Sequence, residues 1–271
     1  MSAYKTLLVE KEGPIDWVTL NRPEALNALN PQLVDELLDY FGGLYMDHSV
    51  RIVVLRGAGR AFCAGLDLKD RSNAPGTSSA VSSSPQAGLV GQRRISEIVM
   101  RMRRAPQPIL SLVHGPACGG GFALALASDI RIAGESARMN AAFIRIGLSA
   151  CDIGVSYFLP RLVGVSVASE LMMTGRFINA ARAERVGLVS EVVPDDQLSA
   201  AAQPYLEEML TTSPLGLRLT KECLNMSTDA GSLEAAIAME DRNQILCAQT
   251  DDFKEGISAF LGKRAPDYKN R

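Results

Sequence analysis

The sequence predicts an α/β fold, in which stacked ββα turns form a spiral and a helical region follows at the C-terminal end. Three observations favour this fold. A succession of strand, strand and helix recurs two or three times without strict repetition, which is more typical of a spiral than of a doubly wound sheet. Two glycine-rich segments each follow an apolar run typical of a buried strand. From residue 154 onward the pattern is mainly helical. We expect a spiral core over residues 1–195 and a helical region over residues 196–271.

The first elements alternate between strands and helices. Strands are expected at 4–10 and 16–20, on either side of a Gly-Pro turn. A helix is expected over 31–46, because apolar residues recur there at three- and four-residue spacing, and a strand follows at 51–56. Residues 71–88 are rich in Ser, Ala, Gly and Pro and are expected to form a surface loop. The later strands are expected at 108–113, 130–133, 137–140 and 189–193, and the later helices at 89–104, 121–128, 156–162, 166–173, 179–186, 197–211, 215–226 and 233–250.

The two glycine-rich segments are the strongest chemical signal in the chain. They are residues 57–68 (GAGRAFCAGLDL) and 115–124 (GPACGGGFAL), and the second runs directly into an Ala/Leu-rich helix. Glycines at a helix start leave backbone N–H groups unpaired at its positive end. One N–H from each segment could hold the same negative oxygen, as in an enzyme that forms an enolate or a tetrahedral oxyanion from a thioester. Taken alone, either segment could be a tight turn, and neither has the spacing of a dinucleotide or phosphate loop.

Composition excludes several classes of partner. The 271 residues are 47% hydrophobic and carry a net charge of −2, which suits a soluble globular chain and gives no attraction to nucleic acid or to an anionic membrane. The N-terminus lacks a long apolar segment, so we expect no leader peptide. The five cysteines are scattered without a Cys-x-x-Cys pair, and no metal-ligand spacing is present, so we predict neither disulfides nor a metal site. A reducing, cytoplasmic location is expected.

Five motifs resemble the crotonase superfamily, which is the enoyl-CoA hydratase/isomerase family, and the resemblance covers nearly the whole chain. They are residues 20–29 (LNRPEALNAL), 61–69 (AFCAGLDLK), 117–121 (ACGGG), 171–189 (which begin LMMTG and end GLV) and 257–264 (ISAFLGKR). The resemblance implies a ββα spiral with a helical trimerisation region, and homotrimers that often pair into dimers of trimers. It also implies acyl-CoA thioester substrates, with coenzyme A entering as part of the substrate and no separate cofactor.

The resemblance also assigns expected roles to individual residues. Leu66 and Gly120 would supply the two oxyanion N–H groups. Phe260 and Lys263 would reach the nucleotide end of a neighbouring subunit's ligand, although Lys263 could equally be an exposed lysine of the tail. The residues that would contact the rest of the acyl-CoA are Ala25, Leu26, Ala64, Asp67, Leu68 and Gly119.

The departures from the family pattern bear directly on the reaction. Hydratases of this family use two glutamates, and the matching positions here hold Ala123 and Phe143, or Ala142 if the alignment shifts by one. One acid remains nearby: Asp152 matches the place where dienoyl-CoA isomerases, which resemble this stretch, carry a catalytic aspartate.

Two interpretations of Asp152 stay open, a single catalytic acid/base or a helix N-cap. Two functions stay open with them: an acyl-CoA enzyme of the hydratase/isomerase type, or a non-catalytic fatty acyl-CoA binding protein. A single carboxylate suits a double-bond shift better than water addition, which needs both a base for water and an acid for carbon.

Overall fold

The computed structural model describes residues 4–69 and 85–271. These fall into two compact units, Met1–Ala105 with Ile109–Ala202 and Pro106–Pro108 with Gln203–Arg271. The division at residue 195 that we expected from sequence remains a prediction about domain organisation. Among the described residues, no helix combines the length and the apolarity needed to cross a bilayer.

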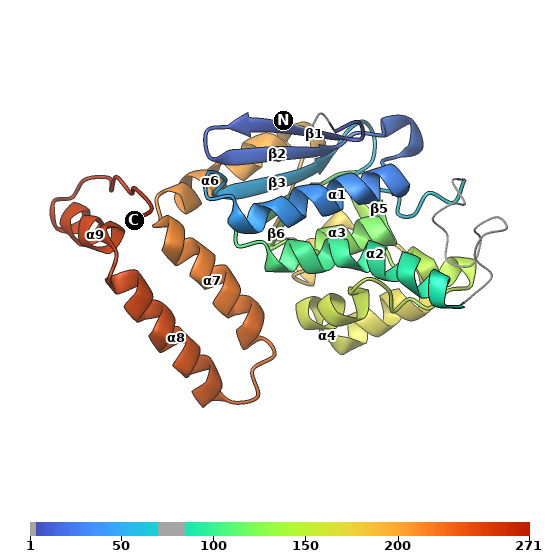
Figure 1. Cartoon of the computed structure of the whole chain (residues 1–271). Helices are drawn as coiled ribbons and strands as arrows, with labels where there is room; N and C mark the ends of the chain where they lie inside the picture. Colours follow the sequence, from blue (N-terminus) through green and yellow to red (C-terminus); the bar gives the residue numbers. More distant parts are fainter. Residues whose placement is uncertain (1–3, 70–84) are drawn as a thin grey trace. The chain divides into compact units, whose positions relative to one another are not determined.

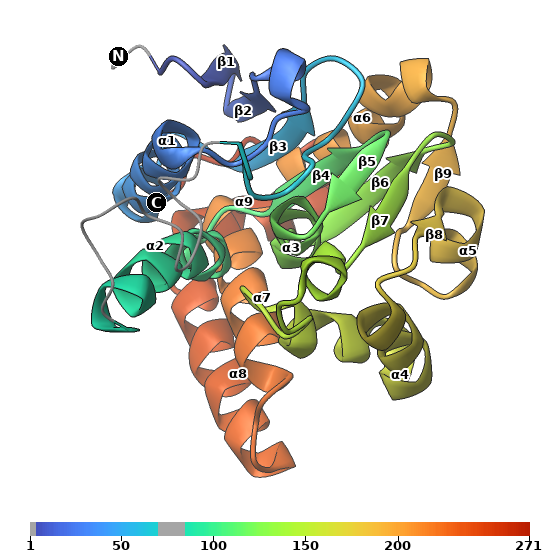
Figure 2. The ribbon, with the colours of Figure 1, turned by 90° about the vertical axis from the view of Figure 1, so that its right-hand side faces the viewer.

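A six-stranded sheet forms the first layer of the larger unit (Figures 1 and 2). Its first two strands are antiparallel and the other neighbours are parallel. The apolar runs predicted as buried strands are its central members, because a parallel sheet buries both faces of its strands. The strand order is β1 (Leu7–Glu12), β2 (Ile15–Leu20), β3 (Ile52–Gly57), β4 (Ile109–Val113), β6 (Ile130–Gly134) and β9 (Glu191–Val193).

A second, three-stranded sheet runs β5 (Pro116–Cys118), β7 (Arg138–Asn140) and β8 (Ile178–Asn179). The chain passes from a strand of the large sheet to a strand of the small sheet and then to a helix, which makes one ββα turn. The predicted ββα spiral is therefore confirmed. The clearest turn is β4, β5 and then α3 (Gly120–Ala127). All eight residues of α3 are buried, as its apolar sequence requires.

Helices cover the large sheet on the side where α1, α3 and α2 lie together in Figure 1. Helix α1 (Pro31–Gly43) begins at Asn30, whose side chain accepts a hydrogen bond from the N–H of Leu33 at 2.9 Å. Helix α2 (Pro85–Arg104) packs against both α1 and α3. A surface loop was predicted at 71–88, and its residues 71–84 lie outside the described residues. For residues 85–88 the prediction was wrong, because they form the first turn of α2.

The remaining elements follow the predicted order closely. The two helices predicted at 156–162 and 166–173 form α4 (Val155–Thr174), which is interrupted at Gly164, where φ is +76°. No helix was predicted after residue 250, where the structure has α9 (Asp251–Leu261), and Thr250, which accepts a hydrogen bond from the N–H of Phe253, starts this helix. The other elements are η1 (Pro23–Ala25), η2 (Leu44–Met46), η3 (Ala142–Ile146), α5 (Ala180–Arg185), η4 (Asp195–Gln197), α6 (Leu198–Leu210), α7 (Pro214–Ser227) and α8 (Leu233–Ala248).

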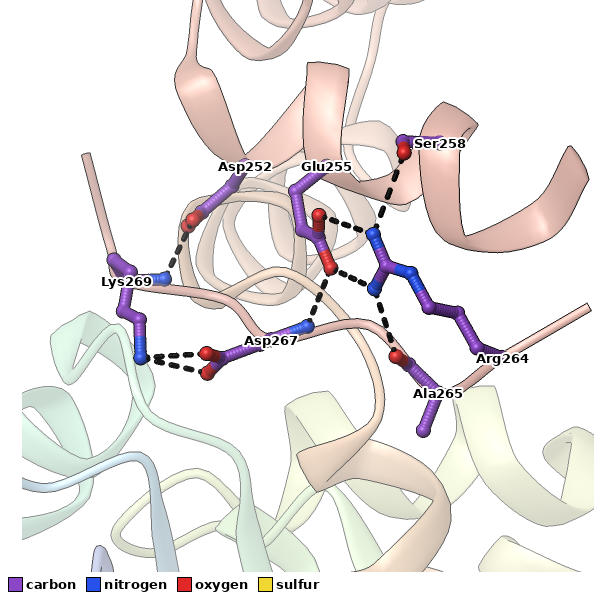
Figure 3. Close-up of polar contacts among 7 residues, drawn as sticks. All are labelled: Asp252, Glu255, Ser258, Arg264, Ala265, Asp267 and Lys269. Atoms are coloured by element: carbon purple, nitrogen blue, oxygen red, sulfur yellow. Dashed lines mark hydrogen bonds and ion pairs between the residues drawn. The ribbon is translucent and has the colours of Figure 1, made fainter. Parts of the chain in front are cut away.

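The C-terminal tail folds back onto α9 (Figure 3). The carboxylate of Asp252 is buried and accepts the backbone N–H groups of Lys269 and Asn270, at 2.7 and 2.9 Å. Arg264 forms a two-pronged ion pair with Glu255, which also accepts the N–H of Asp267. These contacts hold the pKa of Glu255 at about 2. Two acids of one helix turn therefore fix a tail that has no regular structure of its own.

Candidate active site

The two glycine-rich segments predicted from sequence lie side by side. The chain forms a parallel bridge between Cys63 and Ala117. On either side of it, the N–H of Cys63 donates to the carbonyl of Pro116 at 3.2 Å, and the N–H of Cys118 donates to the carbonyl of Cys63 at 2.9 Å. The first segment is thereby fixed against the N-terminus of α3.

Glycine is required where the two segments touch. Gly65 has φ of +93°, and a Cβ atom added there would lie 2.6 Å from the carbonyl oxygen of Cys118 and 3.3 Å from the nitrogen of Gly120. A Cβ atom at Gly121 would overlap the carbonyl of Cys63. Close approach of two backbones, rather than turn formation alone, explains these glycines.

Two backbone N–H groups remain unpaired at this contact. Within residues 4–69 and 85–271, neither the N–H of Leu66 nor that of Gly120 has a hydrogen-bond partner. Gly120 is the first residue of α3, so its N–H belongs to the positive end of the helix. The neighbouring Gly119 is different, because its N–H donates to the carbonyl of Asn140 at 3.0 Å. Leu66 and Gly120 are therefore the free donors, in line with the expected oxyanion pair.

A buried amide that sequence reasoning did not single out holds the first segment. Asn27 is fully buried, and its Nδ2 donates to the carbonyls of Ala58 and Ala61, each at 2.8 Å. Its Oδ1 accepts the N–H of Arg22 at 2.9 Å. The signal was present, because an Asn between two apolar residues of the 20–29 motif has no obvious place on a buried face.

An apolar cavity opens beside the two free N–H groups. Its only titratable side chain, among the residues the structure describes, is that of Asp152. Phe143 and Ala142, the two alternative positions for the second hydratase glutamate, belong to its wall, and Ala123 is fully buried within α3. The lining residues are Leu29, Ala64, Gly65, Leu66, Leu68, Gln92, Ile95, Gly119, Gly120, Ala142, Phe143, Ile146, Leu148, Asp152 and Ile153.

Asp152 does not cap a helix, so the N-cap interpretation was wrong. Helix α4 begins after Gly154, which has no side-chain cap, while Oδ1 of Asp152 accepts the N–H of Ile153 at 2.8 Å and Nε2 of Gln92. Burial raises the pKa of this carboxyl, and the two hydrogen bonds partly offset the rise. Ile153 has φ of +36°, a strained conformation for a β-branched residue, and such strain is concentrated at functional sites.

A polar groove adjoins the cavity and shares Leu66 and Leu68 with it. Four residues expected to contact the acyl-CoA line this groove, whereas Ala64 and Gly119 line the cavity instead. Two of its lining residues, Arg22 and Asp67, form an ion pair at 2.9 Å. The groove is lined by Arg22, Glu24, Ala25, Leu26, Ala28, Arg60, Leu66, Asp67, Leu68 and Lys69, which makes it the more basic of the two spaces.

Phe260 and Lys263 belong to the second compact unit. Phe260 lies on α9 and is 83% exposed, and Lys263 follows the end of that helix. Their expected contact with a neighbouring subunit's ligand stays a prediction. No group of His, Cys, Asp and Glu in the described part of the chain is arranged to hold a metal ion.

Comparison with known proteins agrees with this geometry. Residues 10–271 match the family model described as enoyl-CoA hydratase/isomerase. The chain is 41% identical over 269 residues to a Mycobacterium tuberculosis H37Rv protein named "Probable enoyl-CoA hydratase EchA12", covering 98% of this chain and 94% of the relative. It is 35% identical over 265 residues to the Escherichia coli K12 1,2-epoxyphenylacetyl-CoA isomerase, covering 98% of each. The crystal structure of enoyl-CoA hydratase from Bacillus anthracis superposes with a TM-score of 0.90 at 32% identity, over 98% of this chain and all of that one.

Proposed function

The chain belongs to the enoyl-CoA hydratase/isomerase family, and we propose that this acyl-CoA enzyme catalyses an isomerase-type reaction with Asp152 as its single proton-transfer group. One observation carries the proposal: a half-buried carboxylate and two backbone N–H groups, unpaired among the described residues, line the same apolar cavity. The carboxylate can move a proton, and the N–H groups can hold the negative oxygen that forms when the proton leaves.

In the proposed reaction, two backbone N–H groups bind the thioester carbonyl and one carboxylate transfers the proton. The thioester carbonyl accepts hydrogen bonds from the N–H groups of Leu66 and Gly120, which makes the neighbouring C–H more acidic. Asp152 takes that proton as the C–H bond breaks, and the electron pair moves into the enolate. The proton then returns to another carbon of the same chain, the O–H bond breaks, and the double bond has moved. No atom is gained or lost, so one carboxylate is sufficient.

Hydration requires more than this cavity offers. A water molecule must lose a proton to a base while carbon receives one from an acid. Ala123 and Phe143 occupy the positions where the resemblance implies two glutamates, and Asp152 is the one acid among the described lining residues. The isomerase type is therefore favoured over the hydratase type.

The groove supports a coenzyme A thioester as the substrate. We propose that the polar end of coenzyme A lies along Ala25, Leu26, Asp67 and Leu68, and that the acyl group enters the apolar cavity. Coenzyme A then enters as part of the substrate and leaves with the product, and no separate cofactor or metal is required.

We further propose a homotrimer or a dimer of trimers in the cytoplasm. Large apolar side chains are exposed on α9, with Phe253 at 45% and Leu261 at 75%, which supports a subunit interface there. All five cysteines are free thiols, which supports a reducing compartment.

A turnover panel tests the proposed function. Enoyl-, dienoyl- and hydroxyacyl-CoAs are incubated with the protein, and binding of the same thioesters and of the matched free acids is measured by calorimetry. We expect double-bond migration and a strong preference for the thioester over the acid. Binding without turnover would instead identify a non-catalytic acyl-CoA binding protein. Equal affinity for thioester and acid would contradict the proposed binding of the thioester carbonyl by the N–H groups of Leu66 and Gly120.

A further inference from the structure

Gln92 is the polar neighbour of Asp152 in the cavity. It extends from α2, sixty residues away in the sequence, and its Nε2 donates to Oδ1 of Asp152. Among the described lining residues, Gln92 and Asp152 are the ones whose side chains carry polar atoms. Fixing a glutamine side chain in an apolar wall costs rotational entropy and solvation of its amide. The hydrogen bond to Asp152 compensates for this cost, which indicates that Gln92 acts on Asp152.

The hydrogen bonds to Asp152 fall on one of its two oxygens. Oδ1 accepts both the Gln92 amide and the N–H of Ile153 at 2.8 Å. Oδ2 has no hydrogen-bond partner within the described residues. Two donors occupy the lone pairs of Oδ1, so an incoming proton is directed to Oδ2.

We propose that Gln92 is a positioning residue that reserves Oδ2 of Asp152 as the oxygen that collects the substrate proton and returns it. The inference rests on the proposed function. The C–H bond of the substrate breaks, its proton binds to Oδ2, and the electron pair passes to the enolate at Leu66 and Gly120. The O–H bond then breaks and a new C–H bond forms. Because one oxygen does both, the proton stays on one face of the substrate.

The hydrogen bond from Gln92 affects the pKa of Asp152. Burial raises the pKa of Asp152, and the N–H of Ile153 and the Gln92 amide lower it. No charged or titratable side chain faces Asp152 from α2, α3, η3 or the segment before α4 in the described cavity wall. Gln92 is therefore the side chain that keeps this carboxylate ionised, and so able to accept a proton, at lower pH. Without it, the ionised form would persist only at higher pH.

The test replaces Gln92 by Met in the full-length protein, which keeps the length of the side chain and removes its donor. Isomerisation of an accepted enoyl-CoA is measured across pH. We expect kcat to fall about tenfold or more, since a hydrogen bond to a charged group is lost, while KM is unchanged. The acidic limb of the pH profile should move to higher pH. Val90→Ala, a change at a 61% exposed position of the same helix, should alter neither quantity.

The outcomes separate this inference from the proposed function. If Gln92→Met keeps the wild-type kcat and acidic limb while Asp152→Asn is inactive, the role of Gln92 is overturned and the proposed function stands. If Asp152→Asn keeps its turnover, both are overturned. Should Gln92→Met fail to fold, Gln92→Glu keeps the shape and places a second carboxyl beside Asp152, and its acidic limb must also move upward.

Discussion

At the scale of single residues, the site depends on atoms that are left without partners. Within the part of the chain that the structure describes, Leu66 and Gly120 each present an unpaired N–H and Asp152 an unpaired oxygen, although nearly all buried polar groups in proteins are paired. The motifs predicted the two N–H donors. They did not predict Gln92 or Asn27, because each acts on a segment far along the chain, 60 and 31 or more residues away, and spacing alone does not reveal such contacts.

Gly65→Ala tests the contact between the two glycine segments. The new Cβ would press on the carbonyl of Cys118 and strain a backbone with positive φ, so the segments must move apart. We expect kcat to fall about 10²–10³-fold, the effect of losing one oxyanion donor. Gly43→Ala is the matched control, because a Cβ there meets nothing within 4 Å. Equal activity of both variants, measured on folded protein, would show that the contact is not needed.

At the scale of elements, the hydrophobic pattern predicted most helices and strands to within a few residues. It did so because the strands of the large sheet are buried and the helices are amphipathic or wholly apolar. Helix α9 was not predicted, because the helix expected over 233–250 extends to Thr250, which in the structure is the N-cap of α9. The first strand begins at Leu7 rather than at residue 4, because the preceding backbone binds Glu36 of α1 instead of a neighbouring strand.

Glu36 of α1 is the clearest test at this scale. Its carboxylate accepts the N–H groups of Lys5, Thr6 and Leu7 and the hydroxyl of Thr6, at 2.6–3.1 Å. Glu36→Ala leaves these donors unpaired, and we expect a loss of roughly 2–4 kcal/mol in the free energy of unfolding, measured with urea. Asp35→Ala removes an exposed ion pair from the same helix and should cost less than about 1 kcal/mol.

The same carboxylate predicts a pH dependence. Burial alone would raise the pKa of Glu36, but the hydrogen bonds from Thr6 and Lys5 bring it below its ordinary value. A lowered pKa in the folded state stabilises the protein above the unfolded-state pKa, and the stabilisation is lost as pH falls through the folded-state value. The stability difference between wild type and Glu36→Ala should therefore shrink on acidification. A difference that grows instead would contradict the assigned contacts.

At the scale of the whole molecule, family membership and the exposed apolar residues lead to the same prediction. Sedimentation at micromolar concentration should give a trimer or a dimer of trimers. The physical reason is that apolar area such as that of Phe260 and Leu261 is more stable against another subunit than in water. A stable monomer that retains full turnover would contradict both the assembly and the expected contribution of Phe260 and Lys263 to a neighbouring site.

The central claim is that Asp152 is the proton-transfer group of an isomerase. Asp152→Asn is the direct measurement, because the amide oxygen can still accept the hydrogen bonds of Gln92 and Ile153 while the basic carboxylate is lost. With an enoyl-CoA that the wild type isomerises, we expect kcat to fall about 10²–10⁴-fold and thioester binding, measured by calorimetry, to be unchanged. Turnover at the wild-type rate in the folded Asn variant would contradict it.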